Sequence, residues 1–89
     1  MTQNETPAEQ RRVRLTLSDA LRLTNLAQKR RVSLKAEPMA LVQNPVLREL
    51  ADQFIAEKGE PEIDWERVSG VRVQSALLAG AIVTLDYHR

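Results

Sequence analysis

The side chains that could carry acid–base or metal chemistry are concentrated in one acidic stretch, residues 57–66. They are Glu57, Glu60, Glu62, Asp64 and Glu66. A calcium loop needs a glycine at its sharp turn and a bidentate acid at its end, whereas this stretch has Pro61 in its middle. We therefore expect a solvated acidic loop.

The other residue types on which enzymes depend are scarce. The sequence has no cysteine, and its one histidine, His88, is next to the last residue. A zinc site would have to rest on carboxylates, and a nucleophilic triad needs a base beside a hydroxyl group. Gly59, Gly70 and Gly80 stand too far apart for a phosphate-binding loop. We expect a non-enzymatic protein with no catalytic residues, no metal, no cofactor and no small-molecule substrate.

Basic side chains are distributed unevenly along the chain. Residues 1–35 contain eight basic and three acidic residues, a net charge of +5, and the remainder has a net charge of −4. This asymmetry indicates a basic face and an acidic face, and the basic face would suit a polyanion or an acidic protein. A dipolar surface without a ligand, or a contact between two copies, fits the same charges.

Two predicted elements must position these basic side chains. Residues 11–17 alternate between apolar and polar side chains, which predicts a half-buried strand. Its polar side presents Arg12, Arg14 and Thr16. Residues 18–31 predict an amphipathic helix with Ser18 as its N-cap. Its last turn contains Lys29, Arg30 and Arg31.

The middle of the chain predicts further helical structure. Residues 32–37 alternate briefly and fit either a short extended piece or the entry to a second helix capped by Ser33. Pro38 favours a helix that starts at the proline over one that runs through it. Residues 44–59 predict a helix, with a capping asparagine followed by proline at its start and Gly59 at its end.

The last segment, residues 67–89, fits two structures. Its apolar residues recur every three or four positions, as in a helix, but its end alternates and is β-branched, as in a strand. We predict a helix over residues 68–79 and a strand over residues 81–87 that could pair with residues 12–17. Trp65, just before this segment, is expected to pack over the edge of the core.

These elements predict a small, helix-rich α+β domain over residues 11–89. It would have two to three helices and a short β ribbon or two-stranded sheet. The polar residues 1–10 are expected to be a disordered tail and do not resemble a signal peptide. The longest apolar run is far shorter than the roughly 20 residues that a membrane helix needs. We therefore expect a cytoplasmic protein that has no contact with membranes.

The segment RRVRLTL, the helix that follows it and the segment LAQKRRVSLKAE resemble the opening of ribbon-helix-helix DNA-binding proteins. In that family two N-terminal strands pair across a dimer and enter the major groove, and the start of the second helix holds phosphate. The resemblance covers residues 11–37. It implies Arg12, Arg14 and Thr16 as base-facing residues, and Ser33 with Lys35 as phosphate contacts. Pro38 and Pro45 depart from the family, whose second helix is uninterrupted.

Two functions follow from this basic segment. The first is a small DNA-binding regulator that acts as a homodimer and contacts duplex DNA through its basic strand and helix. The predicted binding residues are Arg12, Arg14, Thr16, Lys29, Arg30, Arg31, Ser33 and Lys35. The alternative is a protein-interaction module, such as an adaptor, an assembly chaperone or an accessory subunit of a phage or secretion assembly. In that case the same side chains would meet an acidic partner.

Overall fold

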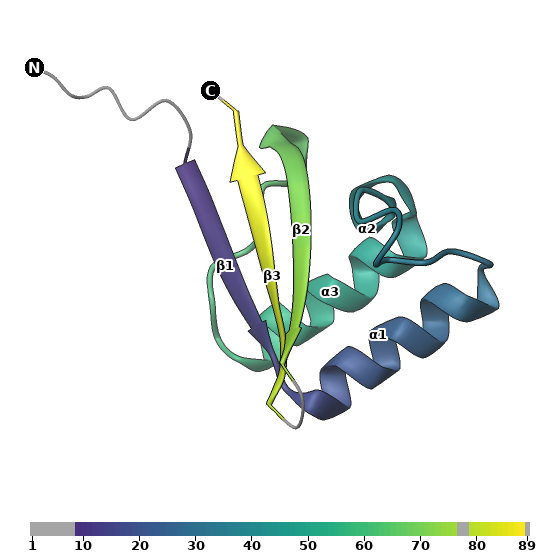
Figure 1. The fold of residues 1–89 in the computed structure, drawn as a ribbon. Coiled ribbons are helices and arrows are strands. Elements are labelled where there is room, and N and C mark those ends of the chain that lie inside the picture. The colour runs from purple at the N-terminus through teal and green to yellow at the C-terminus, as the bar shows by residue number, and fades with distance from the viewer. Residues whose placement is uncertain (1–8, 77–78, 89) are drawn as a thin grey trace, which may run out of the picture.

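A three-stranded antiparallel sheet is the centre of the fold (Figure 1). A computed structural model describes residues 9–76 and 79–88, and within them three α-helices and one 3-10 turn follow the first strand. The elements are β1 (Glu9–Leu15), α1 (Leu17–Lys29), α2 (Ala40–Gln43), α3 (Pro45–Glu57), η1 (Trp65–Arg67), β2 (Val68–Ala76) and β3 (Gly80–Tyr87). The predicted α+β class is confirmed, but the sheet has three strands instead of two.

The strand order is β1–β3–β2, so the last strand lies between the other two. The predicted pairing of residues 81–87 with the first strand is confirmed, with Val13 opposite Val83. The predicted helix over residues 68–79 is wrong, because Val68–Ala76 forms β2 and residues 77 and 78 lie outside the described part. In β2 apolar and polar side chains alternate from position 71 to position 74, and this period of two prevailed over the looser helical spacing.

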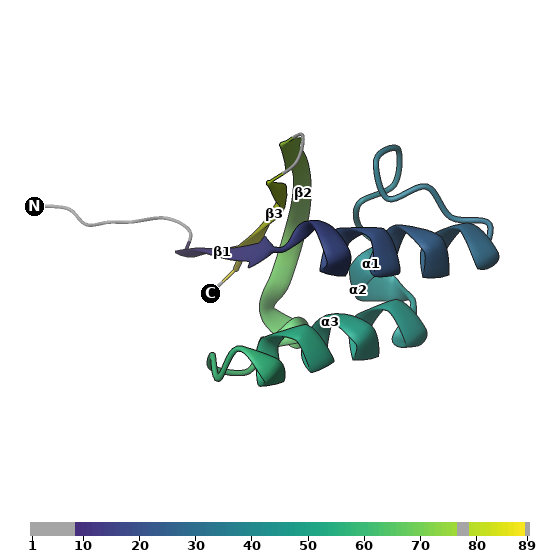
Figure 2. The ribbon, with the colours of Figure 1, turned by 90° about the horizontal axis from the view of Figure 1, so that it is seen from below.

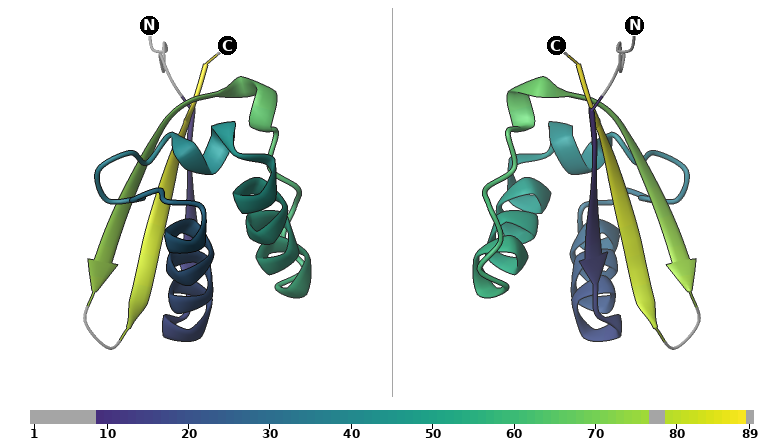
Figure 3. Two further views of the ribbon diagram at one scale, coloured as in Figure 1. Left: turned by 90° about the vertical axis from the view of Figure 1, so that its right-hand side faces the viewer. Right: turned by 90° about the vertical axis from the view of Figure 1, so that its left-hand side faces the viewer.

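The helices cover one face of this sheet. Odd-numbered strand residues such as Val13, Val83 and Leu85 are buried under the helices, whereas Arg12 and Arg14 of β1 are exposed. Figure 3 shows this arrangement in its right-hand view, where the three strands lie in front and α1 lies behind them. The sheet therefore has an inner face, packed on the helices, and an outer face.

Helix α1 begins and ends at other residues than the sequence predicts. Thr16, not Ser18, is its N-cap, and the Thr16 side chain accepts a hydrogen bond of 3.0 Å from the Asp19 amide. At the other end Arg31 has a φ of 61°, and the Val32 amide donates to the Ala27 carbonyl over 2.9 Å. This is a Schellman ending with arginine in the left-handed position that glycine usually occupies.

An ion pair joins α1 to α3. The Lys58 ammonium lies 3.0 Å from an Asp19 carboxylate oxygen. Burial of Asp19 alone would raise the pKa of its carboxyl group. The hydrogen bond and charge of Lys58, together with the hydrogen bonds from Thr16, lower this pKa by more than burial raises it. The net pKa of Asp19 is therefore below its ordinary value, and the pair stabilises the fold until the pH falls through that lowered pKa.

The segment between α1 and α3 is mostly turns. No helix begins at Ser33, whose hydroxyl accepts a 3.4 Å hydrogen bond from the Ala36 amide within a turn. The helix expected to start at Pro38 is only the single turn of α2, which begins at Ala40. The predicted helix over residues 44–59 is confirmed as α3, and Asn44 caps it by accepting hydrogen bonds from two amides of its first turn.

Side chains from both layers form one hydrophobic core. Its largest fully buried members are Phe54, Leu41, Leu47, Ile55 and Leu85. The predicted position of Trp65 is confirmed: the ring packs on the core edge and its indole N–H donates to Asp52 over 2.8 Å. Among the helices that the structure describes, none combines the length and apolar character of a membrane crossing.

Gly80 lies closely against the backbone between β1 and α1 and gives the first prediction. It has a φ of 99°, and a Cβ atom there would lie 2.0 Å from the Leu15 carbonyl oxygen. Gly80→Ala should therefore lower the free energy of unfolding by at least about 3 kcal/mol in urea denaturation. Gly59→Ala is the control, since Gly59 has a φ of 69° with no other atom near. It should cost only about 1 kcal/mol, and equal losses would contradict the steric argument.

Candidate nucleic-acid interface

The outer face of the sheet gathers polar side chains from all three strands. Its members are Gln10, Arg12 and Arg14 of β1, Ile82, Thr84 and Asp86 of β3, and Arg72 and Gln74 of β2. The register places Arg12, Thr84 and Arg72 opposite one another in a single row. Because neighbouring strands are about 4.8 Å apart, the two arginines of this row start about 10 Å apart, on either side of the threonine.

Thr84 stands between the two arginines of this row. It is the one buried polar residue among those described, with 6% of its surface exposed, although no described helix covers this side of the sheet. Long arginine stems can cover neighbouring surface and keep their charged ends in water. The burial of Thr84 is therefore consistent with the stems of Arg12 and Arg72 lying over it from both sides.

The charges on the outer face are not balanced. Its single acid, Asp86, accepts a 3.0 Å hydrogen bond from Gln10 and forms a 3.2 Å ion pair with Arg72. The side chains of Arg12 and Arg14, by contrast, form no hydrogen bond or ion pair with any other described residue. Two residues of one strand on the same face stand about 7 Å apart. The face thus presents two neighbouring guanidinium groups whose hydrogen-bonding capacity is unused within the described chain.

Arg11, next in sequence, behaves differently because it points to the other face. Its guanidinium donates to the Glu62 carbonyl over 3.0 Å and lies 3.5 Å from a Glu60 carboxylate oxygen. The acidic stretch therefore takes up the charge of Arg11 but does not contact Arg12 or Arg14, whose side chains have no ionic or hydrogen-bonding partner among the described residues. Within residues 9–76 and 79–88, no group of acidic or histidine side chains is arranged to hold a metal ion.

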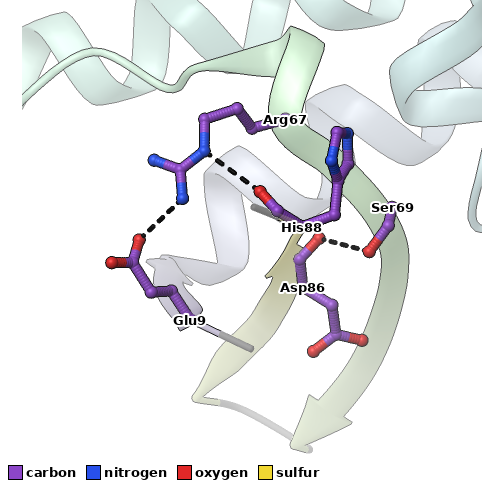
Figure 4. A network of polar contacts seen from close by, with 5 residues as sticks. All are labelled: Glu9, Arg67, Ser69, Asp86 and His88. Atoms are coloured by element: carbon purple, nitrogen blue, oxygen red, sulfur yellow. Dashed lines mark hydrogen bonds and ion pairs between the residues drawn. The ribbon is translucent and has the colours of Figure 1, made fainter. Parts of the chain in front are cut away.

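A polar clamp fixes the end of the sheet at which Asp86 lies (Figure 4). The Arg67 side chain donates to the His88 carbonyl and forms an ion pair with Glu9, both over 3.1 Å. The Ser69 hydroxyl donates to the Asp86 carbonyl over 3.1 Å. These bonds tie the start of β1, the end of β3 and the start of β2 together, and so hold the three strands that carry the outer face.

The predicted binding residues fall into separate groups. Arg12 and Arg14 lie side by side on the outer face, as the alternation predicts. Thr16 faces the first turn of α1 as its cap, which leaves it unsuited to a base-facing role. Ser33 and Lys35 lie in a turn, where no helix start offers amides to a phosphate.

The remaining predicted cluster is far from the sheet. Lys29, Arg30 and Arg31 are exposed at the end of α1, and α1 turns away from the end of β1 at a steep angle in Figure 1 and extends away from the sheet in Figure 2. Thirteen helical residues span about 20 Å. The two basic groups therefore lie at opposite ends of α1, on the order of 20 Å apart, and do not form one compact site.

Sequence reasoning missed the part of the outer face that β2 supplies. Arg72 and Gln74 belong to a segment interpreted as helix, although their alternation with Val71 and Val73 is the same signal that identified the first strand. Gln10 was missed because it was assigned, together with Glu9, to the predicted N-terminal tail. Both residues are in β1, and residues 1–8 of the predicted tail lie outside the described part.

Comparisons with known proteins give no relative from which a function could be transferred. No family model matches the sequence, and neither a curated protein nor a solved structure matches it. The candidate site therefore rests on the geometry and charge of the outer face.

The cap formed by Thr16 gives the second prediction. Thr16→Ala should lower the free energy of unfolding by about 1 kcal/mol, because the Asp19 amide loses its acceptor at the start of α1. Thr16→Ser retains the hydroxyl group and should stay within a few tenths of a kcal/mol of the parent protein. Chemical denaturation followed by circular dichroism measures both, and equal losses in the two variants would rule out the cap.

Proposed function

We propose that the protein is a non-enzymatic DNA-binding protein, and that the outer face of its sheet contacts the phosphates of duplex DNA. The observation that carries the proposal is the pair of guanidinium groups of Arg12 and Arg14, which have no partner within the described part of the chain, with Arg72 across the same sheet. Guanidinium groups form charge-assisted, bidentate hydrogen bonds with phosphate, and such contacts supply most of the affinity in sequence-independent binding.

The residues that the outer face lacks favour duplex over single-stranded DNA. Proteins that bind single strands stack bases on aromatic side chains. The three aromatic residues of this chain are all engaged elsewhere: Phe54 is in the core, Tyr87 is buried and Trp65 packs on the core edge. The outer face therefore offers charge and hydrogen-bond donors without a stacking surface, which suits the phosphate backbone of a duplex.

This proposal differs from the ribbon mode in how β1 would be used. In ribbon-helix-helix proteins the strand pairs across a dimer, whereas β1 here is hydrogen-bonded to β3 of its own chain. The proposed contact therefore uses the outer face as a whole, including Arg72. It does not require β1 to enter the major groove as part of a two-stranded ribbon.

Fluorescence anisotropy with a labelled duplex of about 20 base pairs tests the proposal, and it gives the third prediction. The expected salt dependence is a log–log slope of about −3, since each of three phosphate contacts adds about −0.9. Arg12→Gln with Arg14→Gln should reduce the slope to about −1 and weaken binding at low salt by at least about tenfold.

The matched control removes the same charge from the other basic group. Arg30→Gln with Arg31→Gln lowers the net charge equally but changes the far end of α1, so it should leave the slope within about half a unit of the parent value. Equal losses in the two double variants would mean attraction by net charge alone and would contradict a site on the outer face. Failure to bind any duplex at low salt, with binding to an acidic protein or polyglutamate, would favour the protein-interaction module instead.

A further inference from the structure

Strand β2 leaves one edge of the sheet open. The other edge strand, β1, carries three arginines, and the acidic stretch lies against it through the contact between Arg11 and the Glu62 carbonyl. Between Val71 and Ala76, β2 has Arg72 as its only charged residue, and its backbone forms no hydrogen bond with any described residue outside β3. Edge strands are commonly protected by proline, lysine or bulges, and the one bulge of β2 lies at its beginning, between Val68 and Gly70.

We propose that this edge pairs with β2 of a second copy of the chain, antiparallel and about a two-fold axis perpendicular to the sheet. Such an axis places the outer faces of the two copies on the same side of the joined sheet. Residues that stand opposite each other must then share a face, so only registers that pair residues of the same parity are allowed. This condition leaves few registers to compare.

One register fits the sequence of β2 better than its neighbours. With Val73 opposite Val73 of the second copy, the ladder runs from Gly70 to Ala76 and avoids the bulge. It places Arg72 of each copy opposite Gln74 of the other, an arrangement that pairs a charged donor with an amide oxygen. A shift by two residues in one direction sets Arg72 against Arg72 at the axis and crosses the bulge. A shift in the other direction shortens the ladder to five residues on each copy.

The inner side of the same edge has apolar surface for a second copy to cover. A groove of about 510 Å³ lies between α1, the turn at residues 32–35 and the inner side of β2. Leu34 and Val73, both half-buried, are among the residues that line it. In the proposed register Val73 of the second copy meets Val73, and Val71 of the second copy meets Ser75. Apolar side chains would thus cover the open side of the groove, and burial of apolar surface favours association.

Pairing through β2 would give a continuous six-stranded sheet in the order β1–β3–β2–β2–β3–β1. The two outer faces would join into one surface with Arg72 of each copy near the axis and both pairs of Arg12 and Arg14 at the flanks. This assembly does not depend on the DNA-binding proposal, because it follows from the open edge of β2. It would extend the basic surface if that proposal holds.

Sedimentation equilibrium of the full chain without DNA tests this inference, and it gives the fourth prediction. The expected result is a concentration-dependent mass that rises from 10.1 kDa toward twice that value. Gln74→Arg sets like charges opposite each other twice across the axis and should weaken the dimer by about tenfold, whereas Gln74→Glu should tighten it by a similar factor. The exchange variant Arg72→Gln with Gln74→Arg has the parent composition and should restore the parent dissociation constant to within about threefold.

The two single variants should change the dimer dissociation constant in opposite directions. A loss of folding would not do this, and position 74 is exposed, so neither substitution should disturb the core. A protein that stays monomeric at about 1 mM, or a dimer that responds equally to Gln74→Arg and Gln74→Glu, would overturn the inference. Failure of DNA binding would leave these masses unchanged. If the DNA-binding proposal holds, Gln74→Arg, which adds a positive charge to the outer face, should not weaken DNA binding by the monomer.

Discussion

The fold depends on how closely β3 approaches the junction between β1 and α1. Strand β3 begins at Gly80, which lies against the backbone of Leu15 and Leu17 and leaves no room for a side chain. This approach lets β3 lie beside β1, and β2 then pairs with the free side of β3. Since β1 and β3 are far apart in sequence, the sheet joins the two ends of the described chain and holds the helices on its inner face.

The same pairing separates the charges of the N-terminal strand. Alternation sends Arg11 to the side of the acidic stretch, where Glu60 and a backbone carbonyl take up its charge, and sends Arg12 and Arg14 to the outer face. The positive charge of this strand is therefore divided between two faces of the sheet. On the inner face it is neutralised by the acidic stretch, and on the outer face it is not. The net charge of a segment cannot reveal this division, which depends on which face of the sheet each side chain occupies.

Sequence reasoning succeeded where local signals agreed and failed where they competed. In α3 the capping asparagine, the following proline and Gly59 all indicate the same boundaries, and the structure has a helix between them. The segment after Trp65 carries two periodicities, and only the position of β3 beside it selects the strand. Alternation alone was enough to place Arg12 and Arg14 of the candidate site on one face of a strand. Arg72 and Gln74 show the same alternation, but their segment also has a helical spacing, and the pairing with β3 decides between the two.

The open edge and the outer face follow from a single choice of partner for β1. Strand β1 is bonded to β3 on one side, so a ribbon with β1 of another copy would have to form on its other side. The acidic stretch lies against β1 through Arg11, whereas the edge of β2 has no described strand beside it other than β3, and this difference favours association through β2. An exposed, extended edge strand rich in valine is prone to aggregation, because its unpaired backbone groups can pair with any other strand. A self-complementary register in which Arg72 meets Gln74 would direct that tendency toward one defined partner.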